Sequence, residues 1–494
     1  MRSIAGVLFL LGCLLLFGRA VRAYLRLPSI PGPFLARFTD IWRWRAQNSR
    51  GYSAKLVELH KKYGKLVRIG PNHISISDPN AVPIVYTTSP VWPKAPSYYA
   101  AAPVSGGRAV PSIIAMNEAQ HTAVRRSVGS AFTTNSLLDY ESSIEVSGHD
   151  LLEALEKETV VDITHQLQLW AVDVIMRIAF SESLGFIQKS SDVDGILAAI
   201  IGRFDHWGHW AAVPLLDYLL FKSPFASFVR KKTNSALARV GLEKMQTRPI
   251  LPSQSEQKDL MQKFLEGQAK HPDLVSNDEI LGIIMSTIGA GADTTAGTLT
   301  YTIYLLCQNP EAMKKLQEEL HQALETGTMS YPPKWMEVNR LPYLEAVLKE
   351  SMRIMPIAAW GLDRVVPKGG TTICGQYIPG GAVVGCQIDA TMRDKGVYGD
   401  DSDTFRPERW LDATETQKRR MDRAFIAFSA GKRICMGIHI AWLELKKALP
   451  LLVMNFDMSL VNPSQKPEEE ARISAVKYAP PIWLRLSKKY PKVQ

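Results

Sequence analysis

Apolar residues recur with helical spacing through most of the chain, and only two short stretches alternate as strands do. The helical spacing predicts helices over 142–158, 164–180, 277–308, 310–325, 342–354 and 437–453. Alternation on both sides of Gly70-Pro71-Asn72 predicts a hairpin over 65–77. A second hairpin is expected within 371–388, with its turn at Pro379-Gly380-Gly381. The pattern therefore predicts a mainly α-helical protein with a small β-sheet.

The segment 277–308 predicts one long helix. Ser276 and Glu279 form a capping-box pattern at its start and Asn309-Pro310 ends it, so it would extend over about 48 Å at 1.5 Å per residue. A transmembrane helix is the alternative, but it would place the polar run 293–295 in mid-membrane, where a charge costs about 2.5 to 3.5 kcal/mol. We therefore expect a helix that is buried in a protein core and passes a polar site halfway along.

The first apolar run points to a membrane. Residues 4–18 are uncharged and strongly apolar, and with the stretch up to Leu27 they reach the roughly 20 residues that span a bilayer. A cleaved signal peptide is the alternative. Three arginines follow the run and only Arg2 precedes it, which favours an anchor with the downstream chain in the cytoplasm. We expect an anchor over 1–27, a proline-rich hinge over 28–34 and one folded domain over 35–494.

The net charge of +10 is concentrated at the two ends of the chain. Residues 1–50 carry +7 and residues 474–494 carry +5, which leaves −2 for the residues between them. This distribution, without a binding motif, argues against a nucleic-acid partner. The five cysteines are scattered and form no C-x-x-C pair, so a disulfide framework is not expected and the thiols should be reduced.

One cysteine lies in a setting that suits chemistry. The chain reads Phe428-Ser429-Ala430-Gly431-Lys432-Arg433-Ile434-Cys435-Met436-Gly437 just before a predicted helix. The flanking glycines permit close backbone approach, Arg433 supplies positive charge, and a helix N-terminus favours the thiolate. Such a thiolate could be a nucleophile or an axial ligand of haem iron, although a lone cysteine is usually a small buried hydrophobe. Only His439 lies near enough in sequence to suggest a base for a nucleophile.

The pattern F-x-x-G-x-R-x-C-x-G over 428–437 resembles the cysteine motif of the cytochrome P450 family. Residues 290–295 match its (A/G)-G-x-(D/E)-T-(T/S) element, 350–353 match E-x-x-R, and 405–410 contain P-E-R. The chain looks most like membrane-anchored fungal members of secondary metabolism, similar to the pisatin demethylase group. The resemblance implies the cytochrome P450 fold, mainly α with a small β-sheet region, with a haem-binding domain over 35–494 and a single N-terminal transmembrane helix.

The resemblance also implies haem b as the cofactor and assigns roles to residues of this chain. Cys435 would be the axial ligand of the haem iron. Thr294 and Asp293 would be the catalytic residues that help to deliver protons to the oxygen being activated. The structural alternative for Thr294 is a hydroxyl bonded to the carbonyl of Ala290. Further cofactor contacts are implied for Arg433, Arg125, His121, Arg364, Phe428 and Gly437.

The assignment of His121 has an alternative, and the resemblance adds a group of three charged residues. His121 stands where the family has tryptophan in W-x-x-x-R, and a surface position on a helix is its alternative. Glu350, Arg353 and Arg409 would form a charge-paired triad that braces the proximal side of the haem, a structural rather than a catalytic role. A pair on a solvated helix face is the alternative for Glu350 and Arg353.

Electrons must come from another protein, because the chain has no G-x-G-x-x-G site, flavin signature or P-loop. The resemblance implies NADPH-cytochrome P450 reductase as the donor, with cytochrome b5 as an optional second one. Four basic residues are candidates for the surface that receives them: Lys432, Arg433, Lys446 and Lys447. A solvated charge run is the alternative for the last two.

The resemblance places substrate-facing segments at 95–116, 204–225, 284–294, 356–362 and 474–479. Small apolar and aromatic residues dominate them, which predicts an apolar small-molecule substrate. We therefore expect a haem-thiolate monooxygenase in the endoplasmic reticulum membrane, single-pass, with its catalytic domain facing the cytosol. Oxidative coupling, ring closure or desaturation on the same fold is one alternative. A non-catalytic membrane-anchored haem binder is an alternative of another class.

Overall fold

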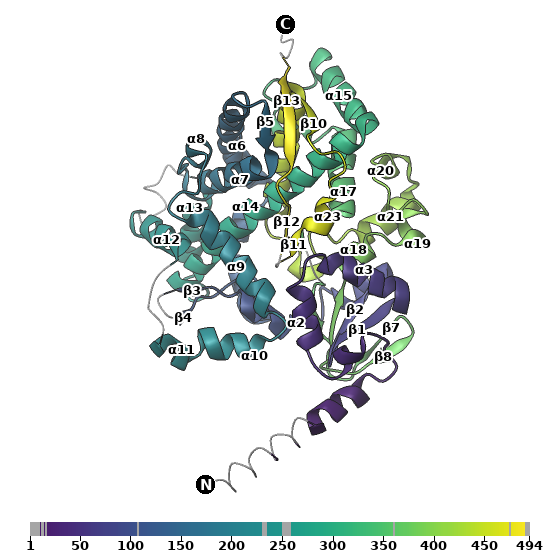
Figure 1. The fold of residues 1–494 in the computed structure, drawn as a ribbon. Helices are drawn as coiled ribbons and strands as arrows, with labels where there is room; N and C mark the ends of the chain where they lie inside the picture. Colours follow the sequence, from purple (N-terminus) through teal and green to yellow (C-terminus); the bar gives the residue numbers. More distant parts are fainter. Residues whose placement is uncertain are drawn as a thin grey trace.

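The computed structural model describes residues 10, 14, 17–105, 108–229, 235–248, 258–358, 361–473 and 476–489, and helices dominate this part of the chain (Figure 1). The long helices are α3 (Tyr52–Tyr63), α5 (Glu118–Val128), α6 (Thr134–Leu155), α7 (Ile163–Phe180), α9 (Ile196–Trp210), α12 (Ala236–Gln246), α13 (Leu260–Lys270), α14 (Asn277–Gln308), α15 (Pro310–Glu325), α17 (Pro342–Ile354), α21 (Glu415–Ala424) and α22 (Ile438–Asn455). The short helices are α2 (Ile41–Gln47), α4 (Val82–Val85), α8 (Phe186–Lys189), α10 (Pro214–Asp217), α11 (Pro224–Val229), α16 (Trp335–Val338), α18 (Ile388–Thr391), α19 (Lys395–Tyr398), α20 (Arg409–Asp412) and α23 (Pro467–Glu470).

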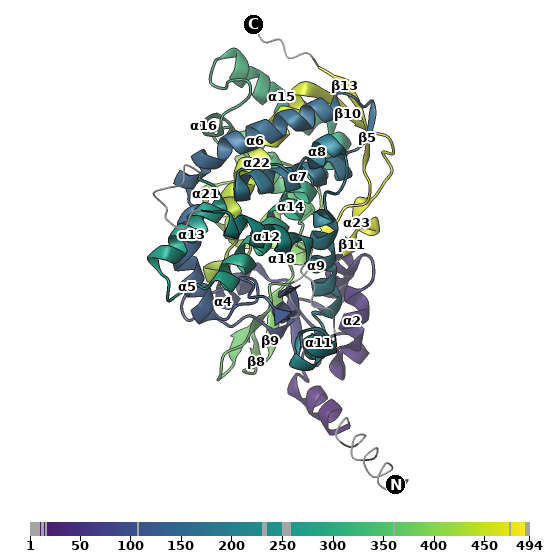
Figure 2. The same ribbon diagram turned by 90° about the vertical axis from the view of Figure 1, so that its left-hand side faces the viewer.

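Helix α14 runs through the centre of the helical part (Figure 2), where α7 and α22 pack against it and α6 packs against α7 and α22. Its ends agree with the prediction. The Ser276 side chain accepts from the Glu279 backbone while the Glu279 carboxylate accepts from the Ser276 backbone, so the capping box is formed. Helices α15 and α17 also have the predicted bounds, whereas α6 begins at Thr134, ahead of the predicted 142.

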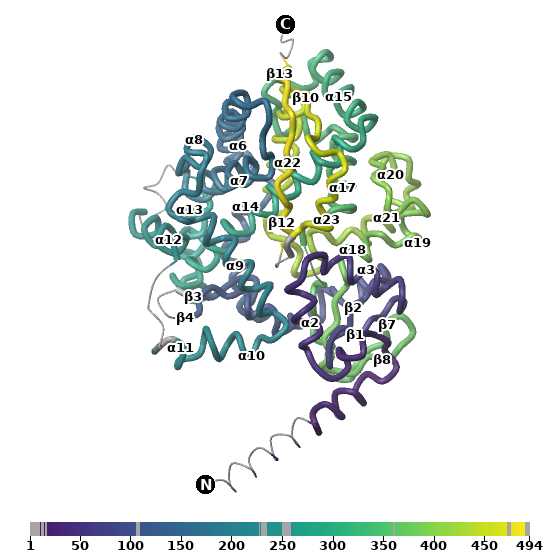
Figure 3. Tube along the Cα trace, in the orientation of Figure 1, coloured from purple at the N-terminus to yellow at the C-terminus, as the bar shows by residue number. Residues whose placement is uncertain are grey.

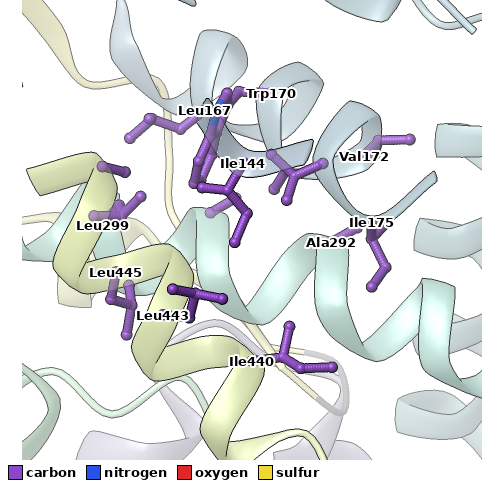
Figure 4. Close-up of a cluster of buried hydrophobic side chains, with 14 of the residues drawn as sticks. Ile144, Leu167, Trp170, Val172, Ile175, Ala292, Leu299, Ile440, Leu443 and Leu445 are labelled. Carbon is purple, nitrogen blue, oxygen red and sulfur yellow. The ribbon is translucent and has the colours of Figure 1, made fainter. Parts of the chain in front are cut away.

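The largest apolar cluster lies where these four helices meet. Figure 4 shows Ile144 of α6, Trp170 of α7, Leu299 of α14 and Leu443 of α22 in one group. Each of these side chains is at most 2% exposed. Full burial of one such side chain is worth about 1.5 to 3 kcal/mol, so this cluster holds the helices in fixed positions around α14.

The largest sheet brings together strands from both ends of the sequence. Its order is β1 (Leu66–Gly70), β2 (His73–Ile76), β9 (Val383–Cys386) and β6 (Arg364–Val365). Strand β2 pairs antiparallel with β1 and parallel with β9, and β9 pairs antiparallel with β6. The β1–β2 hairpin over 65–77 is therefore confirmed. This sheet fixes the chain near Arg364 beside a second apolar cluster that includes Ile74 and Val384.

The second predicted hairpin is wrong in its turn. Strands β7 (Thr371–Ile373) and β8 (Gln376–Ile378) turn at Cys374-Gly375, where both residues have positive φ. The expected turn at 379–381 instead leads into β9, which is not part of the hairpin and pairs within the large sheet.

The remaining strands form three smaller sheets. They are β10 (Phe456–Leu460), β13 (Trp483–Lys488) and β5 (Val160–Asp162), then β11 (Arg472–Ile473) with β12 (Lys477–Tyr478), and β3 (Val104–Ser105) with β4 (Arg108–Ala109).

The N-terminal helix leaves the body of the protein beside β7 and β8 (Figure 3). It is helical over 17–26, and most of the predicted apolar run lies outside the described residues. Buried Arg68 donates hydrogen bonds to the carbonyls of Ala23 and Leu27 at 2.5 and 3.0 Å, which attaches the end of this helix to β1. Within the part of the chain that the structure describes, we find no helix with the length and apolar character needed to cross a bilayer.

Candidate active site

One stripe of the central helix keeps partial solvent access. Helix α14 is buried on almost every side, but Thr287, Ala290, Gly291, Thr294 and Gly297 are only half-buried. These residues recur every three or four positions, so they share one helix face. The stripe includes the polar site expected halfway along the helix.

The hydroxyl of Thr294 is engaged within its own helix. Its Oγ1 donates to the carbonyl of Ala290 at 2.6 Å, which is the structural alternative considered for this residue. Asp293, next to it, is 5% exposed and accepts a 2.6 Å hydrogen bond from the hydroxyl of Tyr478 on β12. Tyr478 lies 185 positions away, in the predicted substrate-facing segment 474–479, but no motif singles it out.

The Cys435 loop is shaped by its own backbone. The Cys435 N–H donates to the carbonyl of Phe428 at 2.9 Å, and Gly437 is the N-cap of α22. Gly431 has a φ of +66°, and a Cβ there would lie 2.0 Å from the carbonyl oxygen of Tyr86, so only glycine fits. This arrangement fixes where the thiol lies.

The Cys435 side chain is solvent-accessible in the structure, although many protein atoms lie around it. Burial raises the pKa of the Cys435 thiol, and the Gly437 N–H and the charge of Arg125 act in the opposite direction. A positively charged metal ion at the sulfur would favour the thiolate much more strongly.

Helices α14 and α22 are joined by a buried acid. Thr295 Oγ1 donates to Glu444 Oε2 at 2.7 Å, and Glu444 is 2% exposed. Burial raises the pKa of Glu444 to about 8, against the opposing effect of the Thr295 hydroxyl. The other oxygen, Oε1, is buried and has no hydrogen-bond partner. The sequence analysis missed this residue, although it is the only acid in α22.

Basic side chains gather beside the Cys435 loop in excess of acids. The group contains Lys94, His121, Arg125, Arg364 and Arg433. Burial and the neighbouring Arg433 and Arg364 charges hold the pKa of Lys94 well below its usual range. Burial, and then the charges of Arg433, Lys94 and Arg125, lower the pKa of His121 to about 3.

A single carboxylate, Glu118, pairs with this group among the described residues, and it bonds Arg433 at 2.8 Å. Among the described residues, the other cations of this group have only neutral hydrogen-bond partners. Arg125 Nη1 donates to the carbonyl of Lys432 at 3.1 Å, and Lys94 Nζ donates to that of Ile114 at 2.8 Å. Buried positive charge without counter-ions is unfavourable. The group therefore fits an anion that the polypeptide does not supply.

His121 gives the second sign of such an anion. It is 4% exposed, so the alternative of a surface position is wrong, and its Nδ1 has no hydrogen-bond partner. Leaving a buried polar atom unsatisfied costs about 1 to 3 kcal/mol. Haem carries two propionate groups, and guanidinium, ammonium and imidazole donors suit them. The sequence analysis missed Lys94, although it is the only charged residue between Asp78 and Arg108.

Glu350 is the centre of a buried charge cluster. Arg353 bonds both of its oxygens at 2.9 Å, and Arg409 Nε bonds Oε1 at 3.1 Å. Trp410 Nε1 donates to Oε2 at 2.9 Å. Because Glu350 and Arg353 are 0% exposed, the alternative of a solvated pair is wrong for them.

The structure contradicts the expected roles of two lysines. Lys446 Nζ lies 2.8 Å from Glu345, and Lys447 Nζ lies 2.6 Å from Glu141, with both lysine side chains at most 4% exposed. They are neither a docking surface nor a solvated charge run. Arg433 is also buried and paired, so Lys432 alone of the four expected residues keeps a half-accessible side chain.

The sequence matches one known family over most of its length. The family model for cytochrome P450 matches residues 31–485. A cytochrome P450 monooxygenase of Aspergillus terreus is 35% identical over 89% of this chain and 92% of its own length. One of Aspergillus flavus is 33% identical over 93% of each chain. The cytochrome P450 monooxygenase mpaDE of Penicillium roqueforti is 32% identical over 91% of this chain, which spans 54% of that relative.

The chain belongs to the cytochrome P450 family. It is accordingly a haem-thiolate monooxygenase, an oxidoreductase whose cofactor is haem b held through a cysteine thiolate. The fold is the mainly helical cytochrome P450 fold with small sheets. When bound, the haem supplies the activation of O2, and the thiolate's electron donation favours O–O cleavage.

Proposed function

We propose that Cys435 is the axial ligand of the haem iron and that Lys94, His121, Arg125, Arg364 and Arg433 hold the propionates. The excess of buried positive charge next to the Cys435 loop is the observation that carries this proposal. Phe428 and Gly437 shape the loop around the sulfur. The visible spectrum of the reduced protein with CO tests the proposal, because a thiolate ligand shifts that band characteristically.

Thr294 and Asp293 are the residues that move protons in this proposal. Their support is position: Thr294 lies on the half-buried stripe of α14, and Asp293 is held by Tyr478. The Glu350, Arg353 and Arg409 cluster braces the segment 392–410, because Arg353 also donates to the carbonyls of Met392 and Ser402.

The substrate in this proposal is a largely apolar small molecule of fungal secondary metabolism. Product analysis with labelled O2 separates oxygen insertion from coupling, ring closure or desaturation.

The same proposal places the protein in the endoplasmic reticulum membrane, anchored by 1–27 through the hinge 28–34, with the domain 35–494 in the cytosol. Support comes from large apolar side chains that are 48 to 88% exposed: Leu215, Leu216, Leu219, Leu220, Phe225 and Phe228. They belong to the α10–α11 region, which lies at the same end of the molecule as the N-terminal helix (Figure 1, Figure 2). Exposed apolar patches mark contact surfaces.

Alkaline extraction of microsomes tests this placement. The full chain should stay with the membrane, and a chain without residues 1–27 should be released. The truncated chain that also carries Leu219→Asp and Phe228→Asp should be released more readily. Protease added to intact microsomes should digest the domain. Its protection inside the vesicles would contradict a cytosolic domain.

Electrons come from NADPH-cytochrome P450 reductase in this proposal, with cytochrome b5 as an optional second donor. Three exposed arginines of α21 join Lys432 as the receiving surface: Arg419, Arg420 and Arg423. Helix α21 ends four residues before Phe428, so it is directly connected to the Cys435 loop. Reversing the three charges should slow NADPH-dependent reduction at low salt and change it little at high salt.

A further inference from the structure

Arg203 connects α9 with α14 and with two residues that precede α5, Ala101 and Ser112. It lies on α9, and its Nη1 donates to the carbonyl of Met285 on α14 at 3.1 Å. Its Nη2 donates to the hydroxyls of Ser286 and Ser112 at 3.1 and 3.2 Å. Its Nε contacts the carbonyl of Ala101 at 3.4 Å. The guanidinium group therefore lies between α9, α14 and the two residues Ala101 and Ser112.

Every hydrogen-bond partner of this guanidinium is neutral. No carboxylate of the described residues forms an ion pair with Arg203, and burial alone lowers its pKa to about 10, so it stays charged at neutral pH. Several other buried cations have carboxylate partners: Arg353, Arg409, Lys446, Lys447 and Lys477. Arg68 has none among the described residues, but six backbone carbonyls accept its hydrogen bonds. A buried charge without a counter-ion is costly, and its retention points to a ligand that completes the pair.

The guanidinium also has room for such a ligand. Its side chain is half-accessible although it contacts Ser112 and Ser286, which are 2 and 3% exposed. Nη1 lies 3.8 Å from the place where a Cβ of Gly289 would be, so the missing side chain leaves space on the α14 side. Among the described residues, Nη1 donates only to the carbonyl of Met285, so its second N–H is available to a ligand.

The surroundings set the size and character of the ligand. Ser286 precedes Thr294 by eight positions, which is about 12 Å along the helix axis. Trp207, one turn after Arg203, packs against Tyr98 with ring centroids 5.7 Å apart. A molecule that reaches from Arg203 to Thr294 would therefore have an acidic end and an apolar body.

We propose that the substrate of this enzyme carries a carboxylate, and that Arg203 binds it while the apolar remainder extends along α14 toward Thr294. This inference rests on the proposed function and refines its substrate class. A guanidinium binds a carboxylate through two parallel hydrogen bonds, which fixes both position and orientation. Arg203 would thus set which carbon lies near Thr294.

The test is spectral titration of the ferric holoenzyme with ω-phenylalkanoic acids from phenylbutanoate to phenyloctanoate, each beside its methyl ester. The wild-type enzyme should bind the best acid at least tenfold more tightly than its ester, because the ester lacks the charge that pairs with the guanidinium. Arg203→Gln keeps donors for the surrounding carbonyls and removes the charge, so it should abolish this preference. Arg203→Lys should retain part of it.

Arg239→Gln is the matched control, because this substitution removes the same charge from an exposed position on α12 that takes no part in the hydrogen bonds of Arg203. It should leave the acid preference unchanged. Acids and esters that bind the wild type within twofold, an absence of binding by every acid, or a preference that survives in Arg203→Gln would each overturn the inference. A missing thiolate-type CO spectrum would instead count against the proposed function, so the two failures are distinguishable.

Discussion

The hydroxyl of Tyr478 donates a 2.6 Å hydrogen bond to Oδ2 of Asp293, and the bond joins the C-terminal β12 to the middle of α14. Both residues are buried, at 9 and 5% exposure. The bond fixes the carboxylate next to Thr294 in one orientation. Tyr478 is therefore a positioning residue for the proposed proton path.

Tyr478→Phe removes this donor and keeps the ring. Loss of a hydrogen bond to a charged group is worth about 1.5 kcal/mol or more, so we expect about a tenfold fall in product formed per NADPH, with a matching rise in released hydrogen peroxide. Tyr304→Phe is the matched control, since the Tyr304 hydroxyl donates to the carbonyl of Gln465 and not to Asp293. Equal coupling efficiencies in the two variants would contradict a positioning role for Tyr478.

Glu444 should make stability fall as pH rises. Its folded-state pKa of about 8 lies above the usual value near 4.5, so the folded protein holds a proton that the unfolded chain releases in between. Stability is then fully present below about pH 4.5 and is lost, by up to roughly 1.4 kcal/mol per pH unit, as pH rises toward 8. Glu444→Gln removes this slope and keeps an acceptor for Thr295.

Thermal unfolding midpoints at pH 6 and pH 8 measure the effect. The midpoint should fall less between these pH values in Glu444→Gln than in the wild type. Glu415→Gln is the control, because Glu415 is exposed on α21. Parallel pH profiles for the wild type and Glu444→Gln would show that Glu444 is ionised throughout.

Arg409→Met should be severely destabilising. It removes one partner of a fully buried carboxylate, and breaking a buried ion pair costs about 3 to 5 kcal/mol. The denaturant midpoint measured by circular dichroism should fall accordingly. Lys315→Met breaks the exposed pair with Glu408 and should change the midpoint little. Similar midpoints for both variants would mean that the Glu350 cluster does not brace the fold.

Lys94→Met should weaken haem retention. If the buried cations hold the propionates, removal of one charged donor should raise the rate of haem transfer to apomyoglobin by about tenfold. Lys61→Met removes an exposed lysine of α3 and should leave the rate unchanged. An unaltered rate in Lys94→Met would exclude Lys94 from the propionate group.

The fold was predictable where local signals were strong. Helix α14 matched its expected bounds because a capping box starts it and Asn309-Pro310 ends it. The hairpin at 371–388 failed because Pro379-Gly380-Gly381 has turn composition, whereas the turn forms at Cys374-Gly375. Strand β9 pairs with β2, about 310 positions earlier, and no local pattern can indicate that partner.

In the site as well, the sequence indicates residues in local motifs but not contacts between distant segments. Cys435 and Thr294 lie in motifs with fixed local spacing, so the sequence alone could single them out. Tyr478, Glu444 and Arg203 have no such motif, and their contacts arise only when distant segments pack together. Lys446 and Lys447 looked like surface charges because their carboxylate partners lie on other helices.

The CO difference spectrum of Cys435→Ser tests the central claim most directly. The wild-type protein, reduced in the presence of CO, should show the band of thiolate-ligated haem. Cys435→Ser should lose that band, while Cys386→Ser, at a buried cysteine of β9, should keep it. An unchanged thiolate-type band in Cys435→Ser would contradict the assignment of Cys435 as the ligand of the haem iron.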